Sequence, residues 1–198
     1  MNIWLKRILF SLLLLLVLAA AINFSFFYAN LKFAFLGHPQ VLDERFRPAA
    51  AGDKKVMDAN YLLIPSLGIQ APVVYAADSS DKGFAESLQN GVVHYPGTAD
   101  FGQAGNCYIF GHSSDYFWSK GKYKTVFALL PQIKIGDKIL VSDPQGNVYT
   151  YIVKEAKIVS PDQTQYLRQD YSKKTLTLQS SWPVGTALKR FLAIAELK

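Results

Sequence analysis

From Tyr61 onward the chain alternates between short apolar runs and clusters of turn-forming residues. The runs are rich in β-branched and aromatic residues, which is typical of strands in an all-β barrel or sandwich rather than of βαβ units. We therefore expect strands over residues 61–64, 72–75, 91–95, 107–110, 138–142, 148–159, 175–179 and 191–197, and one helical turn over 125–130.

One connection between these strands has a recognisable geometry. The segment Pro144-Gln145-Gly146-Asn147 separates the expected strands 138–142 and 148–159. Its residue types favour the tight turns that close hairpins. We therefore expect the two strands to pair as antiparallel neighbours.

The N-terminal region has a different pattern, because the 21 residues from Ile8 to Tyr28 carry no charge. As a helix this run would be about 31 Å long, which matches one bilayer crossing. Lys6 and Arg7 precede it and should hold the N-terminus in the cytoplasm. We expect a single-pass plasma-membrane protein with residues 1–7 cytoplasmic, 8–28 as a transmembrane anchor, 29–60 as a stalk and 61–198 as an extracytoplasmic β domain.

A cleaved signal peptide is the alternative, because the alanines at 19–21 offer a small-residue cleavage site. The anchor is favoured because apolar and aromatic residues continue beyond that site to Tyr28. Both alternatives export the β domain.

The composition argues against several kinds of function. The net charge of +6 is mild, and no basic stripe is interleaved with stacking aromatics, so we expect no nucleic-acid binding. The single cysteine, Cys107, can form neither an internal disulfide nor a cysteine-based metal site. No segment has the ligand spacing of a calcium loop. We expect no cofactor and no metal.

Three ordered motifs lie in the β domain. The first, Gly105-Asn-Cys-Tyr-Ile-Phe-Gly-His112, is a strand followed by Gly-His. The second is Thr177-Leu-Gln-Ser-Ser181, which a Pro/Gly turn follows. The third is Lys189-Arg190, at the start of the last strand. Together they resemble the sortase family, cell-surface transpeptidases that cut a sorting motif and join the acyl fragment to an amine.

This resemblance implies a closed β-barrel of about eight strands with one or two short helices. It implies catalytic roles for His112 and Arg190, and it aligns Ser181 with the family's nucleophilic cysteine. It also implies two partners, a sorting-motif peptide of an exported protein and an amine acceptor, which is a cell-wall precursor or a protein lysine. From the residues alone, all three positions lie at strand ends, where side chains are held rigidly yet face open loops.

The serine leaves two hypotheses open. A thiol titrates near about 8.5 and readily forms a thiolate, whereas a hydroxyl needs a general base within hydrogen-bond reach. In the first hypothesis the protein is a transpeptidase or peptide hydrolase, with Ser181 as nucleophile, His112 as base and acid, and Arg190 as oxyanion or substrate clamp. In the second it is a catalytically inactive sortase-like protein that binds peptides or assists surface-protein assembly.

Four nearby residues have other expected roles. Ser180 should face away from Ser181 and act as a hydrogen-bonder. His94 should support a turn. Cys107 should be buried and inert, because its odd offset from His112 puts the two on opposite faces of a strand. Asp115 is a candidate for orienting the His112 ring.

Overall fold

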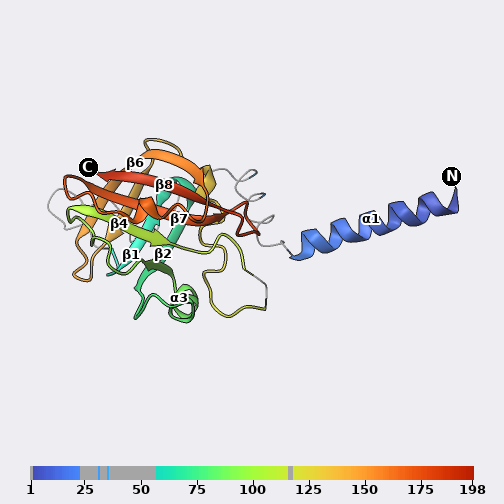
Figure 1. Cartoon of the computed structure of the whole chain (residues 1–198), viewed down its shortest axis with the longest axis horizontal. Helices are drawn as coiled ribbons and strands as arrows, with labels where there is room; N and C mark the ends of the chain where they lie inside the picture. The colour runs from blue at the N-terminus through green and yellow to red at the C-terminus, as the bar shows by residue number, and fades with distance from the viewer. Residues whose placement is uncertain (1, 23–30, 32–34, 36–56, 116–117) are drawn as a thin grey trace.

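The computed structural model describes residues 2–22, 31, 35, 57–115 and 118–198. Within these ranges the chain forms a closed β-barrel with the strand order β1-β2-β3-β4-β7-β8-β6-β5 (Figure 1). The strands are β1 (Tyr61–Ile64), β2 (Ile69–Tyr75), β3 (Val92–His94), β4 (Gly105–Phe110), β5 (Lys138–Ser142), β6 (Val148–Val159), β7 (Lys174–Trp182) and β8 (Lys189–Leu197). The expected closed barrel is therefore confirmed.

Short helices decorate the barrel. The helix α3 (Asp81–Leu88) packs against β2 and β3, and 3-10 turns lie at η2 (Pro65–Leu67), η3 (Leu130–Gln132) and η4 (Thr164–Leu167). The expected helical turn over 125–130 is a run of i→i+3 hydrogen bonds that leads into η3. The expected β5–β6 hairpin is confirmed, with Ser142 paired to Val148 across the turn.

The barrel interior follows the period-two alternation of its strands. Cys107 and Ile109 of β4, and Leu176 and Leu178 of β7, are fully buried in one apolar core. Ala193 of β8 belongs to the same core. The residues between these positions therefore face the outside of the barrel. The same alternation assigns each remaining strand residue to the inside or the outside.

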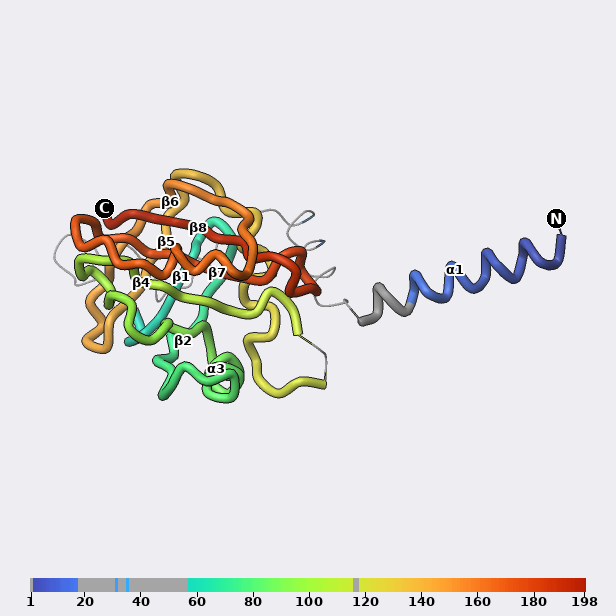
Figure 2. Tube along the Cα trace, in the orientation of Figure 1, coloured from blue at the N-terminus to red at the C-terminus, as the bar shows by residue number. Residues whose placement is uncertain are grey.

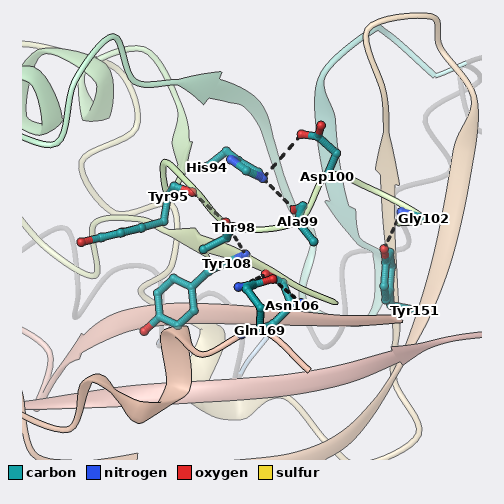
Figure 3. A network of polar contacts seen from close by, with 10 residues as sticks. All are labelled: His94, Tyr95, Thr98, Ala99, Asp100, Gly102, Asn106, Tyr108, Tyr151 and Gln169. Atoms are coloured by element: carbon teal, nitrogen blue, oxygen red, sulfur yellow. Dashed lines mark hydrogen bonds and ion pairs between the residues drawn. The ribbon is translucent and has the colours of Figure 1, made fainter. Parts of the chain in front are cut away.

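A polar network ties the β3–β4 connection to the barrel (Figure 3). His94 makes a 3.0 Å hydrogen bond from Nε2 to the Ala99 carbonyl, which confirms its expected role in supporting a turn. Tyr151 accepts a 2.8 Å hydrogen bond at its hydroxyl from the Gly102 N–H. These contacts fix the entry to β4, the strand that leads to His112.

The N-terminal helix α1 spans Ile3–Ile22. Within the described ranges, no helix combines the length and the apolarity needed to cross a membrane. The anchor expected over 8–28 extends beyond the described residues after position 22, and most of the expected stalk over 29–60 also lies outside them. Met57, inside the expected stalk, is buried against Leu63 and Leu140, so the barrel domain includes residues before Tyr61.

Candidate active site

Strand register brings His112 and Ser181 together. The parallel pair β4–β7 aligns Phe110 with Gln179, and the Gly111 N–H donates a 3.1 Å hydrogen bond to the Gln179 carbonyl. β4 ends at Phe110, so His112 follows two residues after the last paired position, and Ser181 stands two residues after Gln179 on β7. Neighbouring strands are about 4.8 Å apart.

Arg190 completes the group from the other side of β7. It is the direct cross-strand partner of Ser181 in the antiparallel β7–β8 pair. His112, Ser181 and Arg190 all have the outward-facing parity of their strands, because Ile109, Leu178 and Phe191 belong to the core. Figure 2 shows the segment after β4 and the β7–β8 connection at the same end of the barrel. Ser181 and Arg190 are therefore neighbours on the outer face of the barrel, and the segment that carries His112 leaves β4 at the same end.

The backbone of His112 is held by a contact that the sequence did not indicate. The Phe127 N–H donates a 2.9 Å hydrogen bond to the His112 carbonyl, and the Phe127 side chain is fully buried. A Cβ at Gly111 would lie 2.8 Å from Phe127 Cδ2 and 3.0 Å from Val92 Cγ1. Glycine at 111 is therefore required for the close packing that positions His112.

The ring of His112 is half-buried, with its Nε2 4.0 Å from Asp115 Oδ2. Asp115 is held in turn by the Ser119 hydroxyl, which donates a 2.8 Å hydrogen bond to Oδ1. Burial lowers the pKa of His112 below its ordinary value, and the nearby Asp115 carboxylate opposes that shift. The net shift favours the neutral imidazole, the form that accepts a proton.

Arg190 is anchored at one end of its guanidinium. Its Nη1 donates hydrogen bonds of 3.0 Å to the carbonyls of Ala187 and Lys189 in the β7–β8 connection. Within the described part of the chain, the remaining guanidinium nitrogens have no acceptor. They are available to a carbonyl oxygen or to a developing oxyanion.

Ser180, Ser181 and Cys107 are the remaining residues for which the sequence predicted a role. In the described residues no hydrogen bond joins Ser181 Oγ to His112. Ser180 is 1% exposed, and its Oγ has no partner in the described ranges, so its expected role as a hydrogen-bonder is wrong. Cys107 is fully buried, and burial raises the pKa of its thiol, which confirms the expected inert cysteine.

The segment between β6 and β7 forms a wall beside these residues. Tyr166 and Leu167 of η4 pack on an outer-face cluster of Tyr108, Val159 and Leu192. Asn106 Nδ2 donates a 2.7 Å hydrogen bond to the Tyr166 carbonyl. Its Oδ1 accepts a 2.9 Å hydrogen bond from the buried Thr177 hydroxyl, so one side chain ties the wall to β7.

Asn106→Ala is expected to lower the free energy of unfolding by about 1–3 kcal/mol, because it leaves the Thr177 hydroxyl buried and unpaired. It should also speed proteolysis within residues 160–173. Urea unfolding and limited proteolysis of the full chain would measure the two effects. The exposed Gln165→Ala in the same wall is the control. Cleavage of the wall at the parental rate would contradict this role for Asn106.

Comparisons with known proteins agree with this architecture. The sortase domain family matches residues 62–198. Sortase D from Bacillus subtilis is 28% identical over 134 residues, which cover 66% of this chain and 59% of that protein. In solved structures, sortase C-1 from Actinomyces oris is 27% identical, with a TM-score of 0.59 and coverage of 81% of this chain and 82% of that one.

A Clostridium perfringens sortase D5 transpeptidase has the same fold, with 22% identity, a TM-score of 0.58 and coverage of 79% of this chain and 92% of that one. The family match extends over the whole barrel, from β1 to the end of β8. This chain therefore belongs to the sortase family.

Proposed function

We propose that this protein is a serine-dependent sortase-type enzyme that cleaves sorting-motif peptides and transfers the acyl fragment to an amine or to water. Ser181 is the nucleophile, His112 the general base and acid, and Arg190 the clamp for the substrate carbonyl or oxyanion. The observation that supports this proposal is the strand register, which pairs Ser181 with Arg190 and aligns β7 with β4, the strand that leads to His112.

The state of His112 suits a hydroxyl nucleophile. A thiolate beside an imidazolium needs a protonated histidine, whereas a serine needs a neutral ring to take its proton. Burial lowers the pKa of His112 and so favours the neutral ring. With Nε2 facing Asp115, Nδ1 is the ring nitrogen left for proton transfer.

The proposed reaction balances at these three side chains. Ser181 Oγ attacks the scissile carbonyl while His112 accepts the hydroxyl proton, and Arg190 stabilises the oxyanion. Collapse of the tetrahedral intermediate breaks the C–N bond, and His112 returns the proton to the leaving amine. The incoming amine or water then attacks the acyl ester and gives its proton to His112, which passes that proton to Ser181 Oγ as the ester C–O bond breaks.

Two partners and a location belong to the same proposal. The acyl donor is a sorting-motif peptide of an exported protein, and the acceptor is a cell-wall precursor or a protein lysine. We place the chain in the plasma membrane, anchored over residues 8–28, with its N-terminus in the cytoplasm. The uncharged apolar run and the preceding Lys6 and Arg7 support that placement.

A non-catalytic peptide-binding protein is the second candidate. The observation in its favour is that Ser181 Oγ and His112 share no hydrogen bond in the described part of the chain. Catalytic hydrogen bonds often form only in the substrate complex, so the free geometry does not decide between the two.

Trapping the acyl-enzyme separates these candidates. The full chain would be incubated with synthetic sorting-motif peptides, and intact-mass spectrometry would detect an acyl adduct. The enzyme hypothesis expects the adduct on Ser181 and its loss in Ser181→Ala. Ser181→Cys is an informative third protein, because the only other thiol, Cys107, is buried. Peptide binding by the parent, with neither adduct nor turnover, would favour the non-catalytic candidate.

The pH dependence of turnover follows from the state of His112. Its protonated form cannot accept the serine proton, so activity should be lost as pH falls through the lowered pKa of His112 and stay high at pH 7. Asp115→Asn removes the carboxylate that raises this pKa. The acid limb of kcat/KM should therefore move to lower pH in that variant, and an acid limb that moves upward would contradict the assignment.

A further inference from the structure

Gln179 is the outward-facing residue of β7 two positions before Ser181. Its Cα partners are Phe110 on β4 and Leu192 on β8. Its half-buried side chain belongs to the same outer face as Ser181, about 6.6 Å further back along the strand. It is the third residue of the Thr177-Leu-Gln-Ser-Ser181 motif, and the sequence indicated no role for it.

The orientation of the Gln179 amide is set by a buried tyrosine. The Tyr108 hydroxyl donates a 2.7 Å hydrogen bond to Gln179 Oε1. Tyr108 is 5% exposed and packs against Leu192 and the η4 wall, and the Tyr95 ring meets it edge-on at 6.1 Å. Figure 3 shows the two tyrosine side chains next to each other. A side chain packed this closely has few other rotamers, so its hydroxyl is a fixed donor.

The charge state of Tyr108 is consistent with this arrangement. Burial raises the pKa of its hydroxyl well above the ordinary value, so the group keeps its proton at neutral pH. The positive charge of Arg190 acts in the opposite direction. Tyr108 and Gln179 thus form one polar line on the outer face of β7, two residues before Ser181.

The amide nitrogen is the open end of this line. Because Oε1 is occupied by Tyr108, Nε2 points elsewhere with two N–H donors. No acceptor for Nε2 exists in the part of the chain that the structure describes. A bound peptide can offer a carbonyl to this amide. Because the Gln179 side chain is already oriented, forming that hydrogen bond costs little side-chain entropy.

The η4 wall indicates which part of a peptide would meet Gln179. The acyl fragment must stay bound while the leaving amine departs and the acceptor enters. The part of β7 before Ser181, which the η4 wall flanks, therefore suits the acyl fragment. The open end of the strand beyond Ser181 suits the departure of the leaving amine and the entry of the acceptor. An extended peptide covers the distance from Ser181 to Gln179 with about two residues.

Resting on the proposed function, we propose that Gln179 is a substrate-binding residue that donates from Nε2 to a backbone carbonyl of the acyl-side peptide, about two residues from the bond that is cut. Tyr108 is the positioning residue that holds the amide in this orientation. Because every residue offers a backbone carbonyl, this bond fixes the register of an extended peptide against Ser181 and does not select its sequence.

Binding without turnover tests this inference separately from the chemistry. The full chain carrying Ser181→Ala would be screened against a random octapeptide pool, and the tightest peptide would be labelled for fluorescence anisotropy. Gln179→Glu keeps the acceptor for Tyr108 but removes the Nε2 donor, and should weaken binding about tenfold. Tyr108→Phe keeps the ring and should weaken binding about threefold. Gln103→Glu, the same charge change at an exposed site, should have no effect.

A single ester placed at successive positions of the peptide identifies the carbonyl, because an ester carbonyl is a weaker acceptor than an amide. The Ser181→Ala chain should be sensitive at one position, and Gln179→Glu should abolish that sensitivity. An equal ester effect in both proteins, unchanged affinity in Gln179→Glu, or a pool without any binder would overturn the inference. A parent that binds peptide but never cleaves it would overturn only the proposed chemistry.

Discussion

Replacing His112 with alanine is expected to lower peptide turnover about 10²- to 10⁴-fold, the usual contribution of a general acid–base. The reason is specific to a serine nucleophile, because a hydroxyl has no significant ionised fraction at neutral pH and depends on the neutral imidazole beside it. The loss should appear in kcat more than in KM, since the ring acts on the transition state. Initial rates with a sorting-motif peptide would measure both parameters.

His94→Gln is the matched control for that experiment. It removes a histidine whose contacts are structural, a hydrogen bond to the Ala99 carbonyl and stacking on Tyr75 at 4.7 Å. This variant should keep most of the parental turnover once folded. Parental turnover in His112→Ala, together with its loss in Ser181→Ala, would mean that another group is the base.

Phe127→Ala is expected to cost about 3–5 kcal/mol of unfolding free energy, the usual range for truncating a buried phenylalanine. Phe127 is fully buried in the main core, and its ring fills the space beside Gly111. Chemical denaturation of the full chain would measure the loss. Tyr171→Ala, which removes a side chain that is 72% exposed, should stay within about 0.5 kcal/mol of the parent.

The milder substitution Phe127→Leu tests whether Phe127 also affects catalysis, through the backbone of His112. A leucine retains most of the core volume but leaves space next to Gly111, so the Gly111–His112 backbone loses part of its support. We expect stability close to that of the parent with a reduced kcat. A Phe127→Leu protein with parental kinetics would show that the site tolerates movement of the His112 backbone.

The strands were the predictable part of this fold, because each carries a local signal. The bounds of β1, β5 and β6 coincide with the predicted ranges, and β7 and β8 extend slightly beyond them. Helix α3 was missed because it has only eight residues, one of which is a glycine, and the Phe84–Leu88 pair is too short an apolar pattern to indicate a helix. One signal was present, since the Ser80 hydroxyl caps the helix by accepting a hydrogen bond from the Gly83 N–H.

The candidate site residues could be predicted where a sequence motif marks them. The contacts that hold these residues in place could not. His112, Ser181 and Arg190 follow from three short sequence patterns, and in the structure Ser181 and Arg190 are cross-strand partners. The contacts of Phe127 with His112 and of Tyr108 with Gln179 join residues that no local pattern relates. Ser180 failed as a hydrogen-bonder because it faces the apolar interior, where its hydroxyl finds no partner in the described ranges.

The alternation that sends His112, Ser181 and Arg190 outward has an evolutionary consequence. The main apolar core is built from the inward-facing residues of β4, β7 and β8, whereas Ser181 and Arg190 face outward, so an exchange at position 181 leaves the packing of that core unchanged. A lineage can exchange sulfur for oxygen at position 181 without passing through a protein that fails to fold. Such a barrel can change its nucleophile, or lose it, while each variant at position 181 still folds and can be acted on by selection.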